Sequence, residues 1–197
     1  MASVARHHVG VARKPRVQLA GGYFHVFARG VRRTPLFRDF EDRQYFVNLA
    51  GVIAETHSWP VLAYCLMDNH FHLLFQTPQA NLSAGMRRLL GAYAQWFNGR
   101  HHLEGHVFER RFQSVLVQDD SHLLGEIRYV LLNPVRARSC SHPAEWLWSS
   151  YRPTVGLARV PRLLARERVL ELFSGPGGSA VDYFDRFVVG AEDPRVG

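Results

Sequence analysis

Two histidines separated by a single residue, His70 and His72, lie inside a strongly apolar run of the sequence. If this run is a β-strand, alternation places both imidazoles on one face and Phe71 and Leu73 on the other. Two neighbouring neutral rings both need polar partners when they are buried, and a shared ligand would satisfy both. The alternative is a surface strand whose two polar residues face water.

A tyrosine and an asparagine, Tyr129 and Asn133, are spaced four residues apart at the end of a predicted helix. This spacing places them on one face, about 6 Å apart along the helix axis. Pro134 follows at once and is predicted to stop the helix, which would hold the amide in a fixed place. A core tyrosine and a C-cap asparagine would look the same. Together with the histidines, they could form a metal site with a phenol beside it.

Hydrophobic periodicity predicts the elements that must position these groups. Period-two runs and continuous apolar runs indicate strands, whereas apolar residues at helical spacing indicate helices. The order is strand, helix, strand, strand, helix, strand, helix. The predicted ranges are strands at 23–29, 61–67, 70–76 and 113–118, and helices at 41–57, 81–98 and 119–132.

This order predicts an α+β fold with a ferredoxin-like (RRM-like) antiparallel sheet, with the helices on one face and the other face uncovered. We expect three regions along the chain. Residues 1–21 form a flexible basic arm, residues 22–138 form the catalytic domain, and residues 139–197 form a C-terminal extension that packs on it or is tethered to it. Within the extension, helices are predicted at 161–173 and 181–189.

The chain has 197 residues, a net charge of +7 and a hydrophobic content of 47%. Nearly all of its basic residues are arginines, which bind phosphate through a planar, bidentate group. The positive net charge and the many arginines therefore favour a polyanionic partner. The two cysteines form no CxxC pair, which argues against a structural zinc site. No signal-peptide pattern or membrane-spanning run is present in the sequence, and we expect a cytoplasmic protein without a membrane partner.

Five separated blocks of the sequence resemble the single-tyrosine HUH transposases, and within them the REP-associated tyrosine transposases. The resemblance covers roughly residues 20 to 190, with the blocks in the family's order. An isolated His-x-His pattern would mean little, but several ordered blocks are specific. The blocks are residues 22–30, 67–74, 105–112, 128–137 and 146–151.

The resemblance implies a role for each matching residue. His70 and His72 match the histidines that bind Mg²⁺ or Mn²⁺, Asn133 matches the polar residue that completes the metal site, and Tyr129 matches the nucleophile. The implied activity is metal-dependent cutting and rejoining of single-stranded DNA near hairpins formed by repetitive palindromes. The intermediate would be a 5′-phosphotyrosine.

One position departs from the family pattern: Asp68 stands where the family usually has proline. This carboxylate could lie near the metal or point to solvent. DNA phosphates are expected to contact arginines that flank the predicted strands and follow the tyrosine helix. These arginines are Arg29, Arg32, Arg110, Arg111 and Arg136.

Two other functions fit the same sequence. A non-catalytic DNA or RNA hairpin-binding protein would keep the arginines without needing Tyr129. A metal-dependent phosphodiesterase in which water attacks would keep the histidines and form no covalent intermediate. The sequence also leaves open whether the protein is a monomer or a homodimer.

Overall fold

The computed structural model describes residues 17–190, and its centre is a four-stranded antiparallel sheet with strand order β2-β3-β1-β4. The α+β class and the ferredoxin-like antiparallel sheet are therefore confirmed. Most of the predicted basic arm, residues 1–16, lies outside the described residues. The strands are β1 (Gly22–Arg29), β2 (Val61–Leu66), β3 (His70–Thr77) and β4 (Gln113–Leu116).

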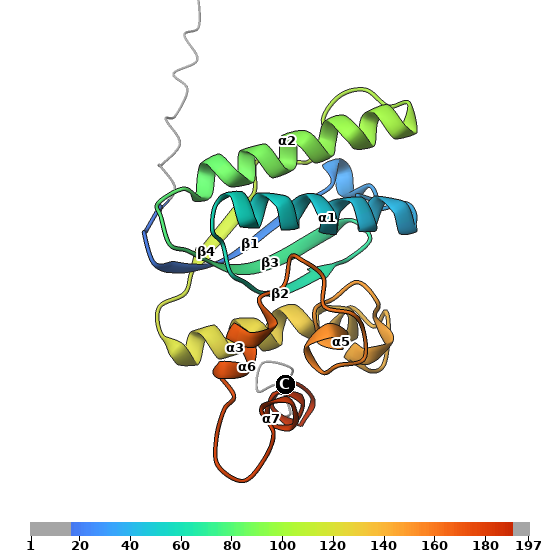
Figure 1. The fold of residues 1–197 in the computed structure, drawn as a ribbon. Helices are drawn as coiled ribbons and strands as arrows, with labels where there is room; N and C mark the ends of the chain where they lie inside the picture. The colour runs from blue at the N-terminus through green and yellow to red at the C-terminus, as the bar shows by residue number, and fades with distance from the viewer. Residues whose placement is uncertain (1–16, 191–197) are drawn as a thin grey trace, which may run out of the picture.

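Two long helices, α1 (Phe40–Thr56) and α2 (Leu82–His101), cover one face of the sheet (Figure 1). Alternation along the strands supplies the apolar side chains beneath them, including Phe24 and Val26 of β1 and Phe71 of β3, which are almost completely buried. Burying each such aromatic ring contributes about 2–3 kcal/mol, so this face forms the main core. Between residues 17 and 190, no helix is long and apolar enough to cross a membrane.

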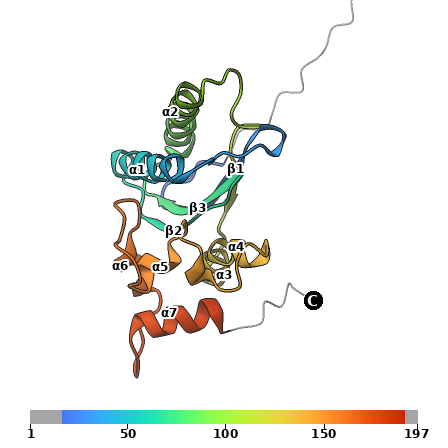
Figure 2. The same ribbon diagram turned by 90° about the vertical axis from the view of Figure 1, so that its right-hand side faces the viewer.

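The opposite face of the sheet is also covered, by α3 (Asp120–Leu131) and the short α4 (Asn133–Arg136) (Figure 2). The prediction that helices lie on one face only is therefore wrong. The physical reason is that the central strands are apolar on both sides: β2 is buried along its whole length, and Leu74 points toward the second face. Strands that read as continuous apolar runs need cover on both faces.

The residues after Arg138 pack along the outer edge of β2 through backbone hydrogen bonds. The N–H of Leu66 donates to Trp148 O, and the N–H of Ala165 donates to Val61 O. Because this extended pairing occupies the residues up to Ala165, the helix predicted at 161–173 is limited to α6 (Arg166–Glu171). The other helices of this region are α5 (Tyr151–Thr154) and α7 (Ala180–Val189).

Ion pairs join the first turn of α1 to the last turn of α2. The Asp42 carboxylate is fully buried and lies 2.7 Å from Arg100 Nη1 and 2.9 Å from His101 Nε2. These contacts explain why α2 continues through His101, beyond the predicted end at residue 98. His101, the last residue of α2, is thereby held against Asp42.

We expect Asp42→Ala to lower the free energy of unfolding by about 3 kcal/mol, because it leaves a guanidinium and an imidazole without their buried acceptor. Urea denaturation monitored by circular dichroism measures this change. The matched control is Glu41→Ala, which removes an exposed partner of the same Arg100 and should change the free energy by less than about 1 kcal/mol. Equal losses in the two variants would contradict the assignment of the anchor to Asp42.

Candidate active site

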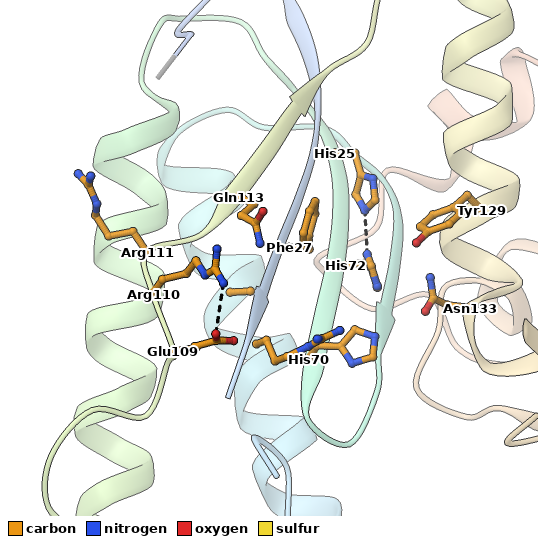
Figure 3. Close-up of a pocket in the computed structure, with 12 residues that line it drawn as sticks. His25, Phe27, His70, His72, Glu109, Arg110, Arg111, Gln113, Tyr129 and Asn133 are labelled. Atoms are coloured by element: carbon orange, nitrogen blue, oxygen red, sulfur yellow. Dashed lines mark hydrogen bonds and ion pairs between the residues drawn. The ribbon is translucent and has the colours of Figure 1, made fainter. Parts of the chain in front are cut away.

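A cavity of about 410 Å³ lies between the second face of the sheet and the α3–α4 segment (Figure 3). Strands β1 and β3 form its floor, and the chain entering β4 forms one side. Most of the residues predicted to be functional meet here. The lining residues are His25, Phe27, Ala28, Arg29, His70, His72, Glu109, Arg110, Arg111, Gln113, Tyr129 and Asn133.

The pairing of β1 with β3 determines which side chains share this cavity. Antiparallel register places Phe27 opposite His72 and Arg29 opposite His70. Directly paired residues point to the same face, so both histidines lie beside Arg29 and away from the main core. The prediction that His70 and His72 share one face is confirmed by this register.

His70 is held by the residue before it. Its Nδ1 lies 2.7 Å from Asn69 Oδ1, and the Nδ2 group of Asn69 donates to the Arg33 carbonyl oxygen at 3.2 Å. Because the amide nitrogen is committed to Arg33, the oxygen must face His70, and His70 Nδ1 must carry the proton. Its Nε2 atom then carries the lone pair.

His72 has a partner that sequence reasoning did not single out. His25 of β1 lies diagonally across the strand pair, with its Nε2 2.8 Å from His72 Nδ1. Its Nδ1 lies 2.7 Å from Glu126 Oε2 on α3, although this oxygen is off the direction needed for an aligned hydrogen bond. Strand alternation already placed His25 on this face, but only the register shows that it reaches His72.

Both cavity histidines are neutral at physiological pH. Burial is the main cause that lowers the pKa of His70, and the positive charge of Arg29 adds to it. The pKa of His72 is lowered further, first by burial and then by His25 and His70. Hydrogen bonding to Asn133 opposes both shifts without overcoming them. Neutral imidazole is the form that binds a metal ion.

Glu126 is a carboxylate in this setting. Burial alone would raise its pKa, but contacts from His25 and His122 more than offset this and lower the pKa below its ordinary value. It precedes Tyr129 by one helical turn, so both side chains lie on the same face of α3. A negative charge is therefore fixed at the base of the histidine pair.

Tyr129 and Asn133 face the histidines from across the cavity (Figure 3). The Tyr129 ring centroid lies 5.7 Å from that of His25 and 5.8 Å from that of His72. The α3 helix ends at Leu131, within one residue of its predicted end, but Pro134 does not stop the helical path. It occupies the first turn of α4, where its missing N–H is tolerated, so the helical path continues past Asn133.

The predicted DNA-binding arginines fall into two groups. Arg29, Arg110 and Arg111 line the cavity, and Arg136 stacks over the Tyr129 ring with its guanidinium carbon 5.0 Å from the ring centroid. Arg32 lies in the 3₁₀ turn Val31–Arg33 after β1 and does not line the cavity. Four of the five are thus brought to the site.

Asp68 does not line the cavity. Its carboxylate forms an ion pair of 2.5 Å with Arg43 Nη2 of α1, and the side chain is otherwise largely exposed. The substitution for the family's proline therefore connects the β2–β3 turn to α1. Its Oδ1 atom is engaged by Arg43, and its charge acts on His70 only as a minor influence that raises the pKa of that residue.

The residues of the cavity could hold a divalent cation through nitrogen and amide-oxygen donors. Within residues 17–190, no group of three or more His, Cys, Asp or Glu side chains is arranged to hold a metal ion. Two neutral imidazoles and the amide oxygen of Asn133 supply three donors and leave positions for water or phosphate oxygens. Imidazole nitrogens alone favour zinc over magnesium, so binding of Mg²⁺ or Mn²⁺ would depend on the amide oxygen, water and phosphate oxygens.

The sequence of this chain matches the model of one protein family, described as IS200-like transposases, over residues 18–130. The matched region includes the four strands, both histidines and Tyr129. This chain is a member of the IS200-like transposase family.

One relative and one solved structure are consistent with this assignment. The chain is 28% identical over 112 residues to a Haemophilus influenzae protein assigned as a REP-associated tyrosine transposase. The match covers 51% of this chain and 64% of the relative, so it spans less than two thirds of that protein. A REP-associated tyrosine transposase bound to a REP hairpin has a similar fold, with a TM-score of 0.62, 17% identity, and coverage of 79% of this chain and 92% of that one.

The buried histidines predict a pH dependence of folding. An unfolded chain takes up protons at His70 and His72 near pH 6.5, whereas the lowered pKa values keep the folded imidazoles neutral. The free energy of unfolding should therefore fall as the pH drops below about 6.5. Urea denaturation between pH 7.5 and 5 measures this dependence.

We expect His72→Gln to make the fall shallower, because the variant lacks the group whose protonation opposes folding. His106→Gln, at an exposed loop position, is the control for loss of a histidine as such. An equally steep dependence in wild type and His72→Gln would contradict the burial argument.

Proposed function

We propose that this chain is a metal-dependent nuclease and strand transferase for single-stranded DNA, with Tyr129 as its nucleophile. One observation supports the proposal most strongly. The same cavity is lined by Tyr129, by the neutral histidines His70 and His72, by the Asn133 amide and by three arginines. Membership in a transposase family supports the same chemistry.

The cation site would be formed by His70, His72 and Asn133. When bound there, Mg²⁺ or Mn²⁺ would supply positive charge that stabilises the charge developing on the scissile phosphate. Arg29 adds a permanent positive charge opposite His70 in the paired strands. The polar and cationic groups of this cavity are therefore arranged to receive a phosphodiester.

Tyr129 would attack phosphorus through its phenolic oxygen. The new bond joins phosphorus to the tyrosine, the bond to the 3′ oxygen breaks, the phenol loses its proton, and the leaving oxygen gains one. The products are a 5′-phosphotyrosine and a free 3′-hydroxyl. A 3′-hydroxyl can then attack the phosphotyrosine and restore a phosphodiester, so the strands can be rejoined without ATP.

The expected substrate is a DNA hairpin with an adjacent single strand. A relative of the same fold is bound to a REP hairpin, and this chain carries a net charge of +7. Arg110 and Arg111 line the cavity and also an adjoining groove of about 570 Å³ beside α2. A single strand that leaves the cavity past these two arginines would keep its phosphates near positive charge.

Incubation with labelled hairpin oligonucleotides and Mn²⁺ tests the reaction. On a denaturing protein gel, wild type should form a covalent protein–DNA band, and Tyr129→Phe and His70→Ala should form none. The matched control is Tyr23→Phe, which lies on the same face of β1 as His25 but outside the cavity and should keep the band.

Cleavage that persists in Tyr129→Phe without a covalent band would instead indicate attack by water. Hairpin binding without cleavage in wild type would indicate a non-catalytic binding protein. Either result would overturn the proposed function.

The arginines give a second test through the salt dependence of DNA affinity. Arg29→Ala and Arg110→Ala should each weaken binding and reduce the slope of log K against log salt by about 0.7, because each removes one phosphate contact. Arg32→Ala, outside the cavity, should change the slope less. Fluorescence anisotropy with a labelled single strand measures these slopes between low and moderate salt. A larger effect for Arg32 than for Arg110 would contradict the proposed path.

A further inference from the structure

The two cavity histidines can bind a cation only if each is in one particular tautomer. A neutral imidazole carries one proton, and the nitrogen that holds it has no lone pair for a metal. In both His70 and His72, the Nδ1 atom contacts another side chain, so Nε2 must be the metal-binding atom. The groups that hold the proton on Nδ1 therefore determine whether Nε2 can bind a cation.

For His70, the adjacent Asn69 is sufficient, because its amide oxygen can only accept a hydrogen bond from Nδ1–H. For His72, the partner is another histidine, which can donate or accept. The contact between His25 and His72 alone leaves the direction of the hydrogen bond undecided. Asn133 also hydrogen-bonds His72, but its amide group can donate or accept, so the direction must be set by the groups beyond His25.

A directional chain of contacts continues beyond His25. The backbone N–H of Gln118 donates to His122 Nδ1 at 3.2 Å, so the His122 proton is on Nε2, which faces Glu126 Oε1 at 3.2 Å. The other oxygen, Oε2, lies 2.7 Å from His25 Nδ1. This contact is an ion pair and not an aligned hydrogen bond, but a nitrogen lone pair at that distance would be repelled by the carboxylate, so His25 Nδ1 carries the proton and its Nε2 is an acceptor.

This series of contacts ends at His72 in the cavity. Since His25 Nε2 accepts, His72 must donate from Nδ1 across the 2.8 Å contact, and its Nε2 retains the lone pair. His25 and His72 are only 4% and 5% exposed, so water has little access to replace either partner. Burial makes the direction strict, because a reversed pair would leave a buried group unsatisfied.

We propose that Glu126 and His25 are positioning residues that hold His72 in its Nδ1–H tautomer, with Nε2 available to a divalent cation. The cation itself rests on the proposed function, whereas the tautomer is a property of the metal-free protein. Glu126 is also one helical turn from Tyr129, and the Tyr129 ring packs on His25. The same contacts therefore set the position of the tyrosine helix relative to the metal ligands.

The experiment is long-range proton–nitrogen NMR of the ¹⁵N-histidine-labelled, metal-free protein, which distinguishes a protonated from an unprotonated ring nitrogen. Wild type should show His72 protonated at Nδ1. In Glu126→Leu, His72 should shift toward the Nε2–H tautomer or a mixture. Glu126→Gln is the conservative variant, since its amide oxygen can still accept from His25, and should keep the wild-type pattern.

Mn²⁺ affinity, measured by electron paramagnetic resonance, is the second readout. Glu126→Leu should weaken binding about 10- to 100-fold, the usual effect of losing an outer partner of a metal ligand. Glu126→Gln should bind more tightly than Glu126→Leu. Asp120→Asn, at an exposed position of the same helix outside these contacts, is the matched control and should stay near wild type.

The two readouts separate this inference from the proposed function. A His72 protonated at Nε2 in wild type, or an Nδ1–H tautomer that is unchanged in a folded Glu126→Leu protein, would overturn the inference. If wild type binds no Mn²⁺ while the tautomer responds as described, the inference holds and the metal requirement of the proposed function fails.

Discussion

The antiparallel register between β1 and β3 is the constraint on which the site depends. It places Arg29 opposite His70 and Phe27 opposite His72, with His25 on the diagonal. A slip of one residue would turn the β1 side chains to the opposite face and separate His25 from His72. The main core opposes such a slip, because Phe24 and Val26 would then leave their positions under α1 and α2.

The cavity exists because α3 and α4 pack over the second face of the sheet, above strands β1 and β3. The apolar side chains of α3, including Ile127 and Val130, are buried on this face and bring Tyr129 toward the histidines. Tight cover excludes water, which lowers the pKa of His72 and keeps it neutral for a cation. The same exclusion favours protein partners for buried polar groups. His72 has a hydrogen-bond partner in His25, whereas Glu126 Oε2 reaches His25 only through an unaligned ion-pair contact.

The sequence was sufficient for the four strands and three long helices of residues 22–132 and for the face shared by His70 and His72, because these follow from local periodicity. The position of Tyr129 near Asn133 also follows from helical spacing. The helices on both faces were missed, although the continuous apolar run of β2 indicated a strand buried on both sides. Local patterns also could not show that Asp68 pairs with Arg43 or that His25 meets Glu126, since these contacts join residues far apart in the sequence.

The central claim is that Tyr129 itself becomes joined to DNA. Mass spectrometry of the tryptic peptides from a covalent protein–DNA complex tests this directly, after nuclease digestion of the bound strand. Trypsin releases residues 129–136, a peptide whose only hydroxyl side chain is that of Tyr129. We predict that this peptide carries the added mass of a 5′-phosphonucleotide. The same added mass on any other peptide would show that a different residue attacks the phosphate.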